Sequence, residues 1–161
     1  KACIDNVEFK EKAKLQIAGD GPSFAELGKL RQRLDAELNI DLLGFRSDVD
    51  KLLKHSDLFA LSSRYEAMPM TIIEAMSCAV PVVCTRVGGV ANLMSEDEGW
   101  LTDSESVEQM ANAFLYAFFH PQQCAELGKK GRQRVEQCYG VNAMVERYSS
   151  IYEVQNMAKG F

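Results

Sequence analysis

Short apolar segments alternate along the chain with longer segments in which apolar and polar residues are mixed. Short, continuous apolar segments predict strands. We place five of them, at Leu15–Ala18, Ile40–Phe45, Asp57–Ser63, Pro81–Thr85 and Gly99–Thr102. Continuously apolar strands separated by helices are typical of a parallel sheet that is covered on both faces. The pattern therefore predicts an α/β fold with a Rossmann-like, doubly wound parallel sheet.

The mixed segments predict the helices that cover this sheet. Proline favours the first helical turn and serine or aspartate favours the N-cap, so we expect Pro22 to open one helix and Ser47 or Asp48 to cap the next. Residues 1–140 are predicted to form the Rossmann-like domain, and residues 141–161 a C-terminal helix on or beyond it. The first expected helix ends near Phe9. The others cover residues 22–38, 47–56, 70–78, 106–119, 121–139 and 142–158.

Composition narrows the class of protein. The chain has 161 residues, of which 47% are hydrophobic, and a formal net charge of −5; this suits one domain with its own core. The acidic balance argues against a nucleic-acid partner, and no apolar segment approaches the roughly 20 residues of a membrane span. Five cysteines without paired metal-ligand spacing indicate reduced thiols in a cytosolic protein and no metal site.

The stretch "SRYEAMPMTIIEAMSCAVPVV" carries the candidate chemistry. Ligands of open parallel sheets bind beyond the carboxyl ends of the strands, and Glu66 lies three residues beyond the third predicted strand. Pro69 favours a helix start there, which leaves the N–H groups of Met70 and Thr71 without helical partners. Such N–H groups, together with the helix dipole, form a phosphate site.

Glu74 lies three residues after Thr71, so it shares the same helical face within the first two turns. We predict that its carboxylate faces the cleft beyond the strand ends, where it can accept hydrogen bonds from the diol of a ribose. A phosphate site flanked by two carboxylates suits a sugar nucleotide. Each glutamate alone also has a structural explanation, because acidic residues are favourable near helix N-termini and ordinary in loops. Only the two glutamates together, with the helix start between them, point to a sugar nucleotide.

In this order, the segments "LQIAGDGP", "LLGF", "DLFALSSRYEAMPMTIIEAMSCAVPVV", "VGG" and "RYSSIY" resemble the C-terminal, nucleotide-binding domain of retaining glycosyltransferases with the GT-B fold, the glycosyl transferases group 1 (family 4). The resemblance implies one half of a GT-B fold. It also implies a nucleotide-diphospho-sugar as donor, with a UDP-sugar favoured by prevalence alone, and a reaction without metal or cofactor. In this family Glu66 matches the residue that contacts hydroxyls of the transferred sugar, and Glu74 matches the one that binds the ribose.

The resemblance also supplies the remaining candidate positions. The turn that contains Pro69, Met70 and Thr71 matches the segment whose backbone amides meet the diphosphate. Arg46 matches a loop position beside the base, and Gly19 and Gly21 match a turn that lines the same cleft. A simple strand-to-helix turn explains these two glycines equally well. Asn92 stands where the family has an acidic residue after the double glycine, so we assign that loop no role.

Three expectations concern the rest of the protein. In the family a first strand, which here would precede Lys1, is followed by an arginine and a lysine that hold the diphosphate. That strand is central in the sheet, so we predict that Leu15–Ala18 and Asp57–Ser63 do not pair directly without it. Without the arginine and the lysine we expect the chain alone to be inactive. An N-terminal acceptor-binding domain is the expected partner. We expect a cytoplasmic location, and we leave open a peripheral association of the full-length protein with the inner face of the membrane. A non-catalytic nucleotide-sugar-binding module and a sugar-nucleotide epimerase are the alternatives.

Overall fold

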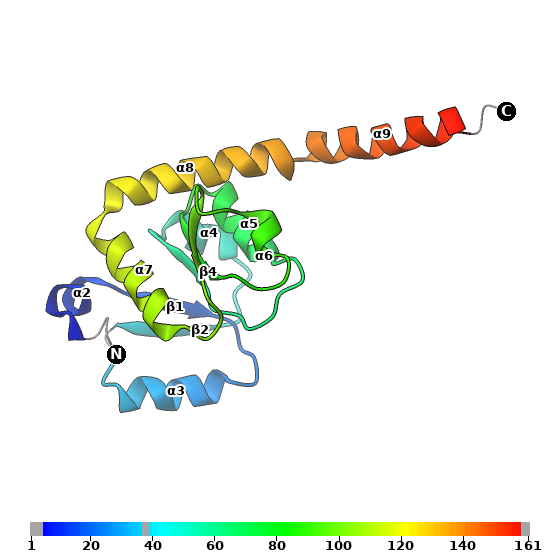
Figure 1. The fold of residues 1–161 in the computed structure, drawn as a ribbon. Helices are drawn as coiled ribbons and strands as arrows, with labels where there is room; N and C mark the ends of the chain where they lie inside the picture. The colour runs from blue at the N-terminus through cyan, green and yellow to red at the C-terminus, as the bar shows by residue number, and fades with distance from the viewer. Residues whose placement is uncertain (1–4, 37–38, 159–161) are drawn as a thin grey trace.

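The computed structural model describes residues 5–36 and 39–158. In this part of the chain five strands form two parallel sheets, one in the order β1-β2 and one in the order β3-β4-β5 (Figure 1). All five strands lie where the sequence predicts them, although β3 is shorter than expected. Their bounds are β1 (Leu15–Ala18), β2 (Ile40–Gly44), β3 (Phe59–Leu61), β4 (Val82–Thr85) and β5 (Gly99–Thr102).

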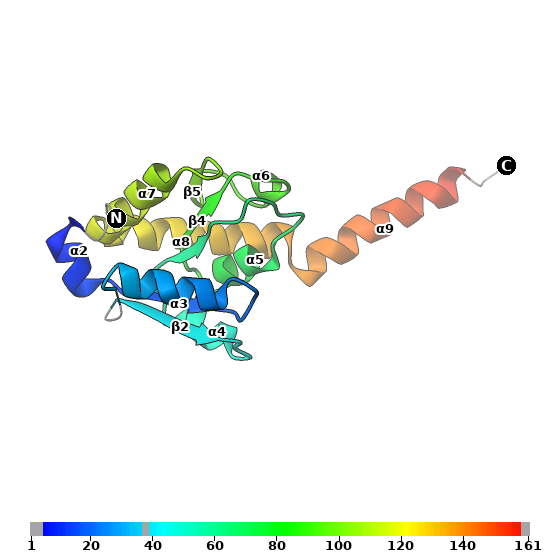
Figure 2. The same cartoon turned by 90° about the horizontal axis from the view of Figure 1, so that it is seen from below.

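Helices lie on both sides of the strands, with α3 and α8 on opposite sides (Figures 1 and 2). The expected helices are present, and a short helix that the sequence did not predict, α6, follows β4. The bounds are α2 (Val7–Lys12), α3 (Phe24–Arg33), α4 (Val49–Lys54), α5 (Met70–Ser77), α6 (Val90–Leu93), α7 (Val107–Phe119), α8 (Pro121–Cys138) and α9 (Val141–Ala158).

Several helix boundaries differ from the prediction. Helix α2 ends at Lys12 and not near Phe9. Helix α3 begins after Ser23 rather than at Pro22, and it ends before Leu34 because Asp35 adopts a left-handed backbone with φ 47°. Residues 37–38 of the predicted helix lie outside the described residues. Asp48 does occupy the N-cap of α4, but its side chain makes no capping hydrogen bond. Its carboxylate accepts two hydrogen bonds from Arg46 instead.

The core surrounds β4 and α5. Every residue of β4 is buried, and on α5 Ile72 and Met76 are 0% and 1% exposed. Helix α8 packs closely at two glycines. A Cβ on Gly131 would contact Met76 of α5 at 3.2 Å, and one on Gly128 would lie 2.0 Å from the carbonyl oxygen of Ala79, just after α5. The core therefore fixes the position of α5.

The two sheets do not join. In the described residues β1 pairs with β2 only and β3 pairs with β4 only, which confirms that Leu15–Ala18 and Asp57–Ser63 are not directly hydrogen-bonded. In a sheet with strand order 3-2-1-4-5-6, a central strand separates this pair. The β1–β2 half is correspondingly exposed: Leu15 is 40% exposed, and neither α2 nor α3 buries a residue.

Helix α9 leads away from the rest of the molecule (Figures 1 and 2). Along it a series of apolar side chains is exposed, including Val141, Val145, Tyr148 and Tyr152. No helix in the described part of the chain is both long enough and apolar enough to cross a membrane.

Candidate functional site

The candidate site lies at the carboxyl ends of β3 and β4. The β3–β4 pair is parallel, so the segments that follow both strands meet at one edge. The segment after β3 carries Glu66 and leads into α5, and the segment after β4 carries Gly88 and Gly89. This is the edge at which open α/β sheets bind ligands.

Glu66 is held at both its side chain and its backbone. The Ser63 hydroxyl donates a hydrogen bond of 2.7 Å to Oε1 of Glu66, and the Gly89 N–H donates one of 3.3 Å to the Glu66 carbonyl oxygen. The side chain is half-buried, so part of it is accessible to a ligand. The structure thus places one carboxylate in a defined position at the rim.

Helix α5 presents its first turn to the same rim. Pro69 is its N-cap residue and is buried, so the helix starts where the sequence predicted. Within the described chain neither the Met70 nor the Thr71 N–H donates to a backbone carbonyl. These two N–H groups are therefore available to an anion, with the positive end of the helix dipole behind them.

Glu74 lies in the second turn of α5, as predicted. It is exposed on the same side of the helix as Met70 and Thr71, whereas Ile72, Ile73, Ala75 and Met76 form the buried side. In the described part of the chain its carboxylate has no hydrogen-bond or ion-pair partner among the contacts found. The direction of its carboxylate relative to a bound donor stays a prediction.

The double glycine after β4 contacts the glutamate loop directly. Gly88 has a φ of +48°, and a Cβ there would lie 1.8 Å from the Glu66 carbonyl oxygen. A Cβ on Gly89 would lie 2.0 Å from the carbonyl oxygen of Ala67. We had assigned this loop no role, so the structure adds it to the site. The signal was present in the sequence, because paired glycines after a strand allow close backbone approach.

Helix α6, which follows the double glycine, is anchored to the C-terminal part of α8 and to Tyr139 through the backbone of Asn92. The Asn92 carbonyl oxygen accepts hydrogen bonds from the Tyr139 hydroxyl at 2.9 Å and from the Arg134 guanidinium at 3.3 Å. Arg134 also donates to the Leu93 carbonyl at 2.7 Å. These hydrogen bonds use the Asn92 and Leu93 backbones and not their side chains.

The remaining candidates belong to the β1–β2 half. Gly19 has a φ of +137° and its N–H donates to the Gly44 carbonyl at 2.7 Å, so it joins the ends of β1 and β2, and Gly21 follows in the same turn. Arg46 is paired with Asp48 at 2.7 Å. This hydrogen-bonded pair raises the pKa of Arg46 and lowers that of Asp48. The structure thus puts these three candidates on a different sheet from Glu66 and Glu74.

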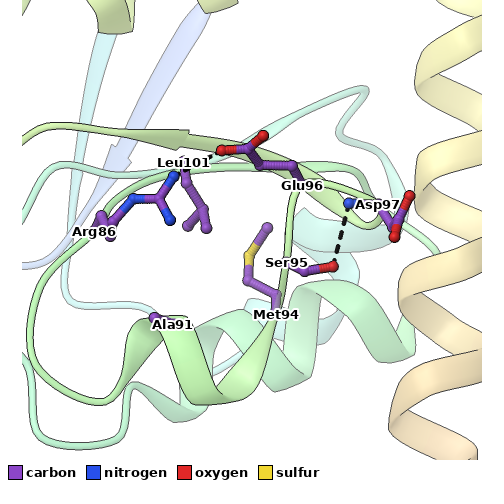
Figure 3. A pocket seen from close by; sticks show the side chains of 7 residues that line it. All are labelled: Arg86, Ala91, Met94, Ser95, Glu96, Asp97 and Leu101. Carbon is purple, nitrogen blue, oxygen red and sulfur yellow. Dashed lines mark hydrogen bonds and ion pairs between the residues drawn. The ribbon is translucent and has the colours of Figure 1, made fainter.

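Two further arginines could add positive charge at the rim, and both are paired in the structure. Arg86 binds Glu96 at 2.7 Å, and Arg64 binds Glu105 at 2.9 Å. A pocket of about 490 Å³ lies around Arg86 and Glu96, which point toward each other across it (Figure 3). It is lined mainly by Arg86 and by residues of the segment between α6 and β5, and it contains neither Glu66 nor Glu74. The candidate site is the exposed rim and not this pocket.

Comparison with known proteins identifies the class to which this fold and rim belong. Residues 1–134 match the family model "Glycosyl transferases group 1". The chain belongs to this family, which confirms the resemblance seen in the sequence. N-acetyl-alpha-D-glucosaminyl L-malate synthase of Bacillus anthracis is 31% identical over 141 residues, which are 87% of this chain and 37% of that protein.

Solved structures show the same fold. Anabaena HepE in complex with UDP matches with a TM-score of 0.83 and 24% identity over 95% of this chain and 44% of that one. Staphylococcus aureus TarM matches with a TM-score of 0.81 and 24% identity over 94% of this chain and 31% of that one. The fold is therefore that of the C-terminal half of a GT-B protein. The chain spans less than half the length of each of these relatives.

Proposed function

We propose that this chain is the donor-binding half of a retaining glycosyltransferase that transfers a sugar from a nucleotide-diphospho-sugar to a glycan, lipid or small-molecule acceptor. One observation carries the proposal: a helix N-terminus with free N–H groups stands between a fixed carboxylate, Glu66, and an exposed one, Glu74. Anabaena HepE, which has the same fold at 25% identity, was solved in complex with UDP-glucose.

The three parts of the rim match the three parts of such a donor. The N–H groups of Met70 and Thr71 suit the diphosphate, because they are unpaired and lie at the positive end of α5. Glu74 accepts hydrogen bonds from the ribose hydroxyls, and Glu66 accepts them from the transferred sugar. Arg46, Gly19 and Gly21, on the β1–β2 half, would contact the base.

The reaction breaks the bond between the anomeric carbon and the diphosphate oxygen and forms one from that carbon to an acceptor oxygen, which loses its proton. Charge develops on the leaving diphosphate, so N–H groups aimed at it favour the transition state. Glu66 orients the sugar and is not the nucleophile. Retention of configuration and independence from metals are part of the proposal.

The rest of the protein enters the proposal in the same way. An N-terminal domain would bind the acceptor and close the cleft over the donor. The location would be cytoplasmic, with peripheral membrane association left as a question for the full-length protein.

The test uses the full-length protein. Calorimetry with UDP, GDP and ADP should show binding of at least one diphosphate, with UDP our expectation. Incubation with sugar nucleotides and candidate acceptors should then release the diphosphate and form a product with the donor's anomeric configuration. Absence of any nucleotide binding refutes the proposal. Binding without transfer favours a non-catalytic module, and conversion of the donor into its epimer favours an epimerase.

A further inference from the structure

We propose that Ser63 and the Gly88–Gly89 loop are positioning elements that fix the Glu66 carboxylate for sugar transfer. The inference rests on the function proposed above and assigns a task to residues outside the donor-binding set. It follows from two sets of contacts with Glu66 itself and from a third set that ties Ser63 to the core.

The first contact orients the carboxylate. Oε1 of Glu66 accepts the hydrogen bond of 2.7 Å from Ser63, which comes three residues earlier at the end of the β3 segment. A hydrogen bond to a charged acceptor is stronger than one between neutral groups. It occupies one lone pair of the carboxylate and leaves the others available for the hydroxyl groups of a sugar.

The second contact fixes the backbone of the same residue. The Gly88–Gly89 loop lies so close to Glu66 and Ala67 that neither glycine has room for a Cβ. Gly89 also donates its N–H to the Glu66 carbonyl. With the carbonyl held by one loop and the carboxylate by Ser63, the side chain keeps little freedom to leave its position.

The third contact ties this arrangement to the core. Thr85, the last residue of β4, is 3% exposed, and its hydroxyl donates a hydrogen bond of 2.5 Å to the Ser63 carbonyl oxygen. Thr102 of β5 is equally buried and donates to the Cys84 carbonyl at 3.4 Å. A buried hydroxyl needs such a partner. Hydroxyl groups therefore link the ends of β3, β4 and β5 to the segment that holds Glu66.

Glu74 provides the contrast. It is exposed and has none of these restraints, so a ligand can draw it into place. A rigid Glu66 is useful only if the position of the sugar decides the rate, and a misplacement of about 1 Å at a reacting centre can lower a rate about a hundredfold. The restraints on Glu66 therefore point to turnover and not to nucleotide affinity.

The experiment compares Ser63→Ala, Ser63→Thr and Ser56→Ala in the full-length protein. Ser56 is the control because its hydroxyl donates a hydrogen bond of the same length, 2.7 Å, but to the backbone carbonyl of Leu52 before β3 begins and not to a carboxylate. We expect Ser63→Ala to lower kcat about ten- to a hundredfold, with the Kd for UDP unchanged. Ser63→Thr should restore most of the rate, and Ser56→Ala should match the wild type.

A double variant separates positioning from a general structural role. If Ser63 acts through Glu66, adding Ser63→Ala to Glu66→Ala should lower kcat no further. An additional loss equal to that of Ser63→Ala alone overturns the proposal. So does an unchanged kcat for Ser63→Ala, or a Kd for UDP that worsens as much as kcat falls.

The loop is tested with Gly88→Ala against Gly28→Ala. A Cβ on Gly28 would have an ordinary contact of 3.9 Å with Leu42, so this control adds a methyl group without a clash. Gly88→Ala should lower kcat as Ser63→Ala does, and if it does not fold, the Ser63 variants decide. If the wild type transfers sugar and the Ser63 and Gly88 variants keep its kcat, the positioning role is wrong but the proposed function stands. An inactive wild type that binds no nucleotide overturns the proposed function and this inference together.

Discussion

Glu74→Ala should separate nucleotide binding from folding, because Glu74 has no partner within the described chain that the substitution could remove. The residue is exposed in the second turn of α5, and Ile72 and Met76 hold the helix from the opposite side. Alanine is also the better helix former. We therefore expect the free energy of unfolding to change by less than about 0.5 kcal/mol, the usual range for surface substitutions.

Binding should change far more. A hydrogen bond to a charged group contributes about 1–3 kcal/mol, which corresponds to a Kd for UDP that is about 5- to 140-fold higher. Glu66→Ala removes the hydrogen bond from Ser63, so it should lower the free energy of unfolding by about 1 kcal/mol. It should spare the binding of UDP, which lacks the transferred sugar, and should lower kcat.

Calorimetry with UDP on the full-length variants, with thermal unfolding measured in parallel, tests this division. Glu108→Ala is the matched control, because Glu108 is an exposed glutamate in the first turn of another helix, α7. It should change neither Kd nor stability. Equal losses of UDP affinity for Glu66→Ala and Glu74→Ala would refute the reasoning, and so would an unchanged Kd for Glu74→Ala.

Two further predictions concern the core. Gly128→Ala should destabilise the protein by about 1–3 kcal/mol, as overpacking does, because its Cβ would lie 2.0 Å from the Ala79 carbonyl oxygen. Gly28→Ala should instead stabilise it by about 0.5–1 kcal/mol. Denaturant unfolding measures both changes, and the same sign for the two variants would contradict this prediction. Burial raises the pKa of Cys84 from 9.0 to about 12, so the unfolded state loses this proton first and stability should fall as pH rises above 9.0. At pH 8, peptide mapping should find Cys78 and Cys138 alkylated before Cys84.

The sequence predicted the strands and α5 well, because these features depend on local composition. Val82–Thr85 is continuously apolar apart from its last residue, and it became the fully buried β4. Pro69 marked the start of α5 because proline fixes φ and lacks the N–H that a first turn leaves unpaired. The restriction acts within a few residues, so no long-range contact was needed to predict it.

Competition between neighbouring groups decides details that the pattern does not show. Asp48 occupies the N-cap of α4, as expected, but its carboxylate accepts hydrogen bonds from the Arg46 guanidinium and not from the helix end. Short polar side chains can satisfy either a helix end or a local partner, and the pattern does not decide between them. Helix α3 likewise ended early at Asp35, whose left-handed backbone aspartate tolerates better than most residues.

The contact between the double glycine and Glu66 lay beyond sequence reasoning for another reason. Gly88 and Glu66 are separated by a helix and a strand, and only the parallel pairing of β3 and β4 brings the segments after them together. Paired glycines show that some backbone approaches closely, but not which one. The sequence therefore identified the carboxylates without showing that one of them is fixed.

The split between the two sheets leads to the last prediction. Glu66 and Glu74 are attached to the β3–β5 half, whose core is fully buried, whereas Gly19, Gly21 and Arg46 are attached to β1 and β2, which are not hydrogen-bonded to it. Under the proposed function a donor would have to contact both halves at once. Two halves without shared sheet hydrogen bonds hold these contacts less firmly than one continuous sheet would.

We therefore expect residues 1–161 alone to bind UDP much more weakly than the full-length protein and to transfer no sugar. Preorganisation raises affinity because less ordering remains to be done on binding, and the separated halves lack it. Calorimetry on both proteins, with circular dichroism to establish that the shorter one is folded, makes the comparison. Micromolar binding of UDP by the 161 residues alone would contradict this prediction, because it would show that the two separate sheets already hold the donor contacts firmly enough.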